Sequence, residues 1–192
     1  MKYVSVDLEM TGLDEETCQI IEIGAVVDDT SHETPIDKLP TFHCYVTHPV
    51  YQGEPFALHM HADTFNKLHH RPEGWRYESV DNIAMAFQSW VEKHFEGKRA
   101  TIAGKNFMSS DMNFLKKLPR FEKTQFKHRC IDPAMKFWRP KTDKEIPNLK
   151  TCMERAGIPG EVTHTALEDA FQVIKLLRYE KIDMPTLEET QQ

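Results

Sequence analysis

The sequence predicts an α/β fold whose sheet begins with antiparallel strands. Three β-rich segments, over 4–9, 19–27 and 41–46, come first along the chain. The two clearest helical patterns, over 79–95 and 166–179, follow later. A run of strands followed by helices is typical of a sheet with helices packed against it.

Length and composition favour one ordinary globular domain. The 192 residues suit a single core, with 40% hydrophobic and 28% charged residues. We expect this domain to cover 1–182, followed by a polar tail over 183–192. No apolar run reaches the roughly 18 residues that a membrane span needs, and Met1 leads directly into the first strand, so we expect neither a membrane segment nor a signal peptide. The cysteines show no pair at zinc spacing, which predicts free thiols in a reducing cytoplasm; they are Cys18, Cys44, Cys130 and Cys152.

The net charge of −6 hides an uneven distribution of charge. Acidic residues predominate over 1–97 and 156–192, whereas basic residues predominate over 98–155. A basic middle segment could gather phosphate groups in a chain that is acidic overall. The charges could equally mix on the folded surface, and the sequence leaves both interpretations open.

The first strand carries two acidic residues on one face. Strand periodicity places Asp7 and Glu9 on the same side, about 6–7 Å apart along the chain. Two carboxylates about 4 Å apart repel by about 4 kcal/mol at an effective dielectric constant near 20. Such a face is therefore either solvated, as in an edge strand, or it binds hard cations such as Mg²⁺ or Mn²⁺. For this pair alone the solvated strand is the favoured interpretation.

The segment 19–27 is predicted to form a hairpin with the first strand, and a loop then leads to 41–46. Residues 47–78 are expected to be rich in loops, with one short helix over 62–70. The histidines of this region include a His-x-His pair, but partners at zinc spacing are missing, so a structural or surface role is favoured. The four within 59–70 are His59, His61, His69 and His70.

The second half of the chain holds a third acidic residue at the start of a helix. Asp111 falls in the first turn of a segment over 109–118, where Ser109 or Ser110 can act as the N-cap. The helix dipole favours an anion there, so a capping role alone would explain Asp111. The other elements expected are strands over 100–103 and 129–132, and helices over 79–95, 134–138, 149–156 and 166–179.

The last strong helix begins with an unusual pair of side chains. Thr165 and Glu168 have the spacing of a capping box, which places His164 at N′ and Asp169 at N4. These two positions face each other, so the cap would bring an imidazole and a carboxylate to one spot. An ordinary surface contact would explain this pair equally well if nothing else were known.

Taken in order, these motifs resemble the DEDDh branch of the 3′–5′ exonucleases, the superfamily that includes oligoribonuclease, ribonuclease T and the proofreading exonuclease of DNA polymerase III. The segment 7–14, Asp-Leu-Glu-Met-Thr-Gly-Leu-Asp, resembles the opening motif of oligoribonuclease. The segment from Gly104-Lys105-Asn106-Phe107 to Asp111 resembles the second motif, and 164–169 resembles the third. Each match is weak alone, but the three together are specific and extend over most of the chain.

The resemblance implies a ribonuclease H-like fold, with a mixed five-stranded sheet flanked by helices. It also implies two divalent cations, Mg²⁺ or Mn²⁺, that clamp the attacking and leaving oxygens of a phosphodiester. Asp7, Glu9 and Asp169 would hold one ion, and Asp7 with Asp111 the second. His164 would take the proton from the attacking water. The partner would be the single-stranded 3′ end of RNA or DNA, the product a nucleoside 5′-monophosphate, and the assembly a homodimer.

The same resemblance assigns residues to substrate binding, with backbone groups at the 3′-hydroxyl and a leucine against a base. They are Met10, Thr11, Gly12, Leu13, Asn106, Phe107 and His164. Residues 29–76 do not resemble oligoribonuclease. Preferences for RNA or DNA, and for substrate length, are therefore not implied.

Three other functions remain open on the sequence alone. An endonuclease of the ribonuclease H type would use the same carboxylates. A nucleic-acid-binding module could keep the fold without catalysis, although the presence of all five motif residues weighs against it. A small metal-binding or interaction protein with chance acidic residues is the least favoured class.

Overall fold

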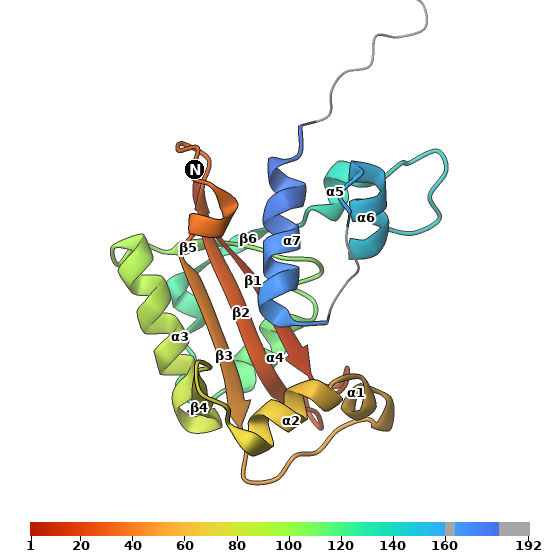
Figure 1. Ribbon diagram of the computed structural model, residues 1–192. Coiled ribbons are helices and arrows are strands. Elements are labelled where there is room, and N and C mark those ends of the chain that lie inside the picture. The colour runs from red at the N-terminus through yellow and green to blue at the C-terminus, as the bar shows by residue number, and fades with distance from the viewer. Residues whose placement is uncertain (160–163, 181–192) are drawn as a thin grey trace, which may run out of the picture.

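The computed structural model describes residues 1–159 and 164–180 of the chain, and Figure 1 shows one sheet with helices packed on both of its faces. The strands are β1 (Lys2–Met10), β2 (Ile20–Asp29), β3 (Thr41–Thr47), β4 (Tyr77–Ser79), β5 (Ala100–Ala103) and β6 (Phe126–Ile131), in the order β4-β3-β2-β1-β5-β6. The helices are α1 (Pro55–Met60), α2 (Ala62–His70), α3 (Val80–Phe95), α4 (Asp111–Lys117), α5 (Ala134–Phe137), α6 (Leu149–Ala156) and α7 (Ala166–Arg178), with short 3₁₀ turns at Ile36–Lys38 and Lys123–Gln125.

The sheet is mixed, as the family resemblance implied, and it begins with antiparallel strands. β1, β2 and β3 pair antiparallel, whereas β4, β5 and β6 each add in parallel to a neighbour. The predicted number of five strands is wrong, because β4 adds a sixth beside β3. This strand has only three residues, which is too short to show an alternating pattern, and it lies at the end of the segment predicted to be loops.

Most of the other predicted elements are confirmed. The hairpin, the short helix over 62–70 and the helix over 149–156 form where the sequence placed them. Helix α1 was not predicted; it starts with Pro55, which fits the first helical position because its missing N–H would have no partner there. β6 begins earlier than expected, at Phe126. The end of the expected domain at 182 and the polar tail over 183–192 lie outside the described residues.

The alternation along β1 divides its side chains between two packed layers. Val4, Val6 and Leu8 face α3 and α4 and join the larger hydrophobic core. Tyr3 faces the other layer, where it packs with residues of α7. Side chains two residues apart share a face, so Asp7 lies on the α7 side of the sheet. Figure 1 shows α7 crossing that face in front of β1 and β2.

Helix α7 is fixed against the sheet at both of its ends. Near its start, Gly24 of β2 has no side chain and lets the first turn of α7 approach the backbone closely. The Ser5 hydroxyl donates to the carbonyl of Ala170 at 2.9 Å. Near its end, the Arg178 guanidinium donates to both carboxylate oxygens of the buried Asp28, at 2.6 and 3.0 Å. The first turn of α7 is thereby held over the C-terminal half of β1.

None of the helices within residues 1–159 and 164–180 combines the length and the apolar run needed to cross a bilayer. Cys18, Cys44, Cys130 and Cys152 are all free thiols, and three of the four are buried.

Candidate active site

Three carboxylates meet where β1 passes under the first turn of α7. Oxygens of Asp7, Glu9 and Asp169 all lie within 4.8 Å of one another. Glu9 and Asp169 are buried, at 7% and 6% exposure, and Asp7 is half-buried. One oxygen of Asp169, Oδ1, is buried and accepts no hydrogen bond from any described residue. A buried acceptor without a donor, next to two more carboxylates, is the arrangement that a cation completes.

Asp111 reaches the same cluster from the opposite side of β1. It is the first residue of α4, as predicted, and its Oδ1 accepts a hydrogen bond from the Leu8 backbone N–H at 3.1 Å. β5 pairs with β1 only at Val4 and Ser5, so the N–H of Leu8 lies beyond that pairing and Asp111 satisfies it. The negative charge of Asp111 also acts on Asp7. The four acidic residues singled out in the sequence are therefore neighbours.

Burial raises the pKa of all four carboxyls, and repulsion by nearby carboxylates raises it further at Asp7, Glu9 and Asp169. The pKa of Asp7 lies well above its usual value because of burial and the charges of Asp111 and Glu9. Burial, followed by the charge of Glu22, raises the pKa of Glu9 to about 9. Burial raises the pKa values of Asp111 and Asp169 to about 7. These groups cannot all ionise together near neutral pH without bound positive charge, and hard divalent cations fit their oxygen atoms.

The raised pKa values predict that stability depends on pH and on added metal. A carboxyl that is protonated in the metal-free folded state ionises in the unfolded state near pH 4, so stability should fall as the pH rises from about 5 to about 9. Each pKa unit corresponds to about 1.4 kcal/mol, and 1 kcal/mol shifts Tm by about 2–4 °C at this chain length, so a loss of several degrees is expected. Thermal unfolding in EDTA at pH 5.5 and 8.5 would measure it.

Added Mg²⁺ or Mn²⁺ should restore stability, and more strongly at pH 8.5 than at pH 5.5, because the ligands must lose their protons to bind. Equal stabilisation by metal at both pH values would contradict the protonated state of the cluster.

A fifth carboxylate, Glu22, lies directly behind the cluster and was not singled out in the sequence. It is opposite Glu9 in the β1–β2 pairing and is fully buried. His43 Nε2 lies 2.7 Å from one of its oxygens, and the Thr64 hydroxyl donates to the other at 3.4 Å. The signal that could have found it is a lone acidic residue within the apolar run of β2.

His61 also borders the cluster, which the sequence did not indicate. It is 3% exposed, and its Nε2 lies 3.4 Å from Glu9 Oε2. Burial is the main cause that lowers the pKa of its imidazole. The other three histidines of the segment 59–70, His59, His69 and His70, are exposed. No spacing in the sequence separates His61 from them, because its place depends on how α1 and α2 pack against β1.

His164 is exposed, with a left-handed backbone at φ 52°. It makes no hydrogen bond or ion pair with Asp169 in the part of the chain that the structure describes, so the predicted meeting of these two side chains is not a direct contact. Thr165 occupies the N-cap position of α7, but its side chain makes no capping hydrogen bond, and the predicted capping box is not formed. His164 instead lies near His61, whose pKa its charge lowers further.

The segment after β1 forms a tight loop beside the cluster. Thr11 is fully buried, and its hydroxyl accepts a hydrogen bond from the Gln19 N–H at 2.8 Å, so this side chain holds the loop together. Gly12 is buried, Met10 is half-buried and Leu13 is 81% exposed. The exposed Leu13 is the apolar side chain that this loop presents to solvent.

The second segment predicted to bind substrate also has one exposed and one buried residue. Asn106 is exposed, with φ 56°, and its N–H donates to Asp132 at 3.0 Å. Phe107 is 1% exposed and packs in the larger core. In this conformation the ring of Phe107 supports the loop and does not offer a face to a base.

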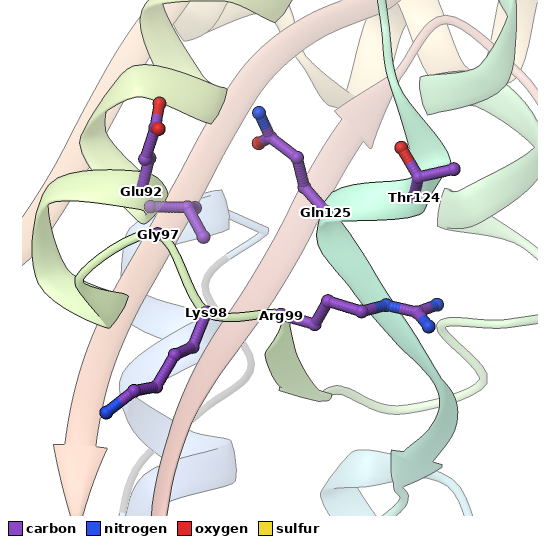
Figure 2. A pocket seen from close by; sticks show the side chains of 7 residues that line it. Glu92, Gly97, Lys98, Arg99, Thr124 and Gln125 are labelled. Carbon is purple, nitrogen blue, oxygen red and sulfur yellow. The ribbon is translucent and has the colours of Figure 1, made fainter.

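A small cavity of about 150 Å³ lies at the other end of the sheet, between the end of α3 and the start of β6 (Figure 2). Arg99, on its lining, donates to the Phe126 carbonyl at 2.8 Å. Arg99 precedes β5, which runs parallel to β1, so this cavity lies at the end of the sheet where β1 begins, away from Asp7. None of the residues predicted for the site lines it.

Comparison with known proteins identifies the family of this chain. A family model described as "Exonuclease" matches residues 4–177. An oligoribonuclease of Dichelobacter nodosus is 32% identical over 187 residues, covering 92% of this chain and 91% of the relative. An oligoribonuclease of Buchnera aphidicola is 31% identical over 190 residues, covering 95% and 92%.

Among solved structures, E. coli Exonuclease I in complex with a dT13 oligonucleotide superposes with a TM-score of 0.66 at 15% identity. The match covers 98% of this chain but 43% of that protein, so it shows the fold alone. The sequence motifs, the full-length relatives and the shared architecture agree, and the chain belongs to the exonuclease family, in the DEDDh branch of the 3′–5′ exonucleases.

Proposed function

We propose that this chain hydrolyses phosphodiester bonds at the single-stranded 3′ ends of RNA or DNA and releases nucleoside 5′-monophosphates, with two divalent cations in the site. The observation that carries the proposal is the meeting of Asp7, Glu9 and Asp169 within 4.8 Å, with Asp111 beside them. The exonuclease family is metal-dependent, and this buried group of carboxylates fits that requirement.

Mg²⁺ or Mn²⁺ are the cations we propose, because all the candidate ligands are carboxylate oxygens. Asp7, Glu9 and Asp169 would hold one ion, and Asp7 with Asp111 the other. When bound, the two ions would stabilise negative charge on the attacking and leaving oxygens of the phosphodiester. The carboxylates would fix the positions of the ions, and the burial of Glu9, Asp111 and Asp169 would limit the access of competing water.

His164 would accept the proton of the attacking water at a ring nitrogen. Two observations support this role: the ring is exposed, and the charge of His164 acts on His61, which borders the carboxylates at Glu9. Imidazole is the side chain whose charge ordinarily changes between pH 5 and 8, as a general base at neutral pH requires.

The loop after β1 would bind the terminal nucleotide. Backbone groups of Met10 and Gly12 would lie at the 3′-hydroxyl, Thr11 would hold the loop from within, and the exposed Leu13 would pack against a base. The exposed Asn106 would contact the next nucleotide, with Phe107 supporting its loop from the core. Such contacts are tolerant of base sequence, as expected for an exonuclease.

The experiment that tests this function is digestion of matched RNA and DNA oligomers, each labelled at the 5′ end and carrying either a free or a blocked 3′-hydroxyl. We expect a ladder of products that shortens from the 3′ end, complete loss of activity in EDTA, and stalling at the blocked end. Cleavage of the blocked oligomer would point to an endonuclease of the ribonuclease H type. Binding without turnover in Mn²⁺ would point to a module without catalysis.

Three further expectations belong to this proposal. A single domain over 1–182 is supported by the family match over 4–177. A cytoplasmic location is supported by four free cysteines. The homodimer is tested by light scattering of the purified chain.

A further inference from the structure

A second hollow lies on the α7 side of the sheet, next to the carboxylate cluster. It has a volume of about 750 Å³ and is bounded by the first turns of α7, by β3 and by the loop that follows α2. None of the residues assigned to catalysis or to the terminal nucleotide lines it. The lining residues that matter for its chemistry are His43, Tyr45, Lys67, Trp75, Leu167 and Lys175.

The wall of this hollow is a preassembled aromatic cluster around Trp75. The indole is 43% exposed, and the rings of His43 and Tyr45 pack edge-on against it at centroid distances of 5.3 and 5.6 Å. Lys67 Nζ lies 4.7 Å from the indole centroid and donates to the Tyr45 hydroxyl at 2.9 Å. A large apolar side chain is therefore held in place while much of it faces solvent. Such a side chain loses little conformational freedom when a flat ligand stacks on it.

The charges around the cluster fit a ligand that carries both a base and a phosphate. Lys67 and Lys175 line the hollow, and neither forms an ion pair with any residue in 1–159 or 164–180. Two carboxylates, Asp37 and Glu168, also lie on its lining. Lysines supply positive charge to a phosphate, whereas carboxylates accept hydrogen bonds from ribose hydroxyls or from the amino groups of bases. An inorganic anion would be attracted by the two lysines but would make no favourable contact with the two carboxylates.

The hollow and the carboxylates are parts of one continuous surface. Tyr45 is opposite Glu22 across β2 and β3, and Glu22 is opposite Glu9 across β1 and β2. With adjacent strands about 4.8 Å apart, the backbone of Tyr45 lies about 10 Å from that of Glu9. The first turn of α7 supplies Leu167 to the hollow and Asp169 to the cluster. A nucleic acid strand or its product could therefore reach the hollow without leaving this face.

We infer that this hollow is a nucleotide-binding subsite in which a base stacks on Trp75 and its phosphate lies at Lys67 and Lys175. The inference deepens the proposed exonuclease function and rests on it for the identity of the ligand. The nucleotide can come from two sources. It is either a nucleotide of the substrate strand on the 5′ side of the scissile bond, or the released nucleoside 5′-monophosphate.

The test measures binding without hydrolysis, in EDTA, so that it does not depend on catalysis. AMP, inorganic phosphate, a 5′-fluorescein dinucleotide and a longer 5′-fluorescein oligomer are titrated into the wild-type chain and into Trp75→Ala. Trp138→Ala is the matched control, because Trp138 is exposed to a similar degree, 40%, but does not line the hollow. Circular dichroism and thermal unfolding establish that each variant is folded.

Loss of a stacking platform should weaken binding on the order of ten- to hundred-fold. A loss for the longer oligomer but not for AMP assigns the hollow to the substrate strand, and a loss for AMP assigns it to the product. Trp75→Phe, which keeps a flat ring, should retain most of the affinity in either case. Inorganic phosphate alone should bind weakly to all variants.

Unchanged nucleotide affinities in Trp75→Ala, an equal loss in Trp138→Ala, or no nucleotide binding by the wild-type chain would each overturn the inference. The proposed function is judged separately, by digestion of the end-labelled oligomers. If the wild-type chain degrades 3′ ends, and Trp75→Ala binds and degrades oligomers of every length normally, the proposed function stands and the subsite is rejected.

Discussion

An Asp7→Asn variant is expected to lose hydrolysis and, in metal-free buffer, to gain stability. Burial, followed by the charges of Asp111 and Glu9, raises the pKa of Asp7 well above its usual value. Asparagine keeps the shape of the side chain but removes the charge that a cation would bind and that its neighbours repel. The two effects on the same residue have opposite signs, which separates a functional carboxylate from a structural one.

The loss of activity should be at least about 10³-fold, because the proposed function makes Asp7 a ligand of both ions, and such a ligand contributes several kcal/mol of transition-state stabilisation. At pH 8 in EDTA the variant should unfold at a temperature at least about 2–4 °C higher, which corresponds to about 1 kcal/mol of relieved repulsion. At pH 5 this gain should shrink, since the wild-type cluster is then largely protonated. The measurements are initial rates on a 3′-end substrate and thermal unfolding at both pH values.

Asp63→Asn is the matched control, since Asp63 is an exposed carboxylate in the first turn of α2. It should leave the rate unchanged and alter stability by less than about 1 kcal/mol, the usual contribution of a charge at a helix start. Normal hydrolysis by Asp7→Asn would reject the assignment of Asp7. If the metal-free variant is less stable than the metal-free wild type, the Asp7 carboxylate of the wild type is held by hydrogen bonds and is not strained by repulsion.

Local patterns in the sequence singled out the four acidic residues, but only the family resemblance joined them into one site. Asp7 and Glu9 follow from the period of a strand, and Asp111 follows from a helix start. Asp169 was placed by a capping box whose side-chain bonds do not form, yet it still reaches the cluster because the packing of α7 on β2 brings it there. The contact of Asp169 with His164 that the capping box predicted is not made, whereas its place beside Asp7 and Glu9 is the one that the family resemblance implied.

Residues that join the site through register or packing could not be predicted in this way. Glu22 lies behind Glu9 only because the hairpin pairs those two positions, and a shift of one residue would turn it to the other face. His61 reaches Glu9 through the packing of two short helices, of which α1 was not predicted. Trp75 belongs to a segment expected to be a loop, and its partners lie on a strand far from it along the chain.

The close approach of α7 to β2 makes Gly24 a position where one added methyl group should lower both the stability and the activity. A Cβ at this position would lie inside van der Waals contact with the backbone of Ala166 and Leu167. Backbone atoms cannot rotate away as a flexible side chain would, so the first turn of α7 must move. Gly24 is directly opposite Asp7 in the β1–β2 pairing, so that movement separates Asp169 from Asp7.

Gly24→Ala should therefore destabilise the fold by about 1–3 kcal/mol, the usual range for overpacking, and reduce activity by about 10²-fold, as a misplacement of about 1 Å can. Gly97→Ala is the matched control: a Cβ there meets open space, but its φ of +70° strains any residue other than glycine by about 1–2 kcal/mol. It should lose similar stability and keep its rate per folded molecule. If both variants lose only stability, the approach of α7 to β2 serves folding alone; a loss of metal-induced stabilisation in Gly24→Ala but not in Gly97→Ala ties this glycine to the geometry of the carboxylate cluster.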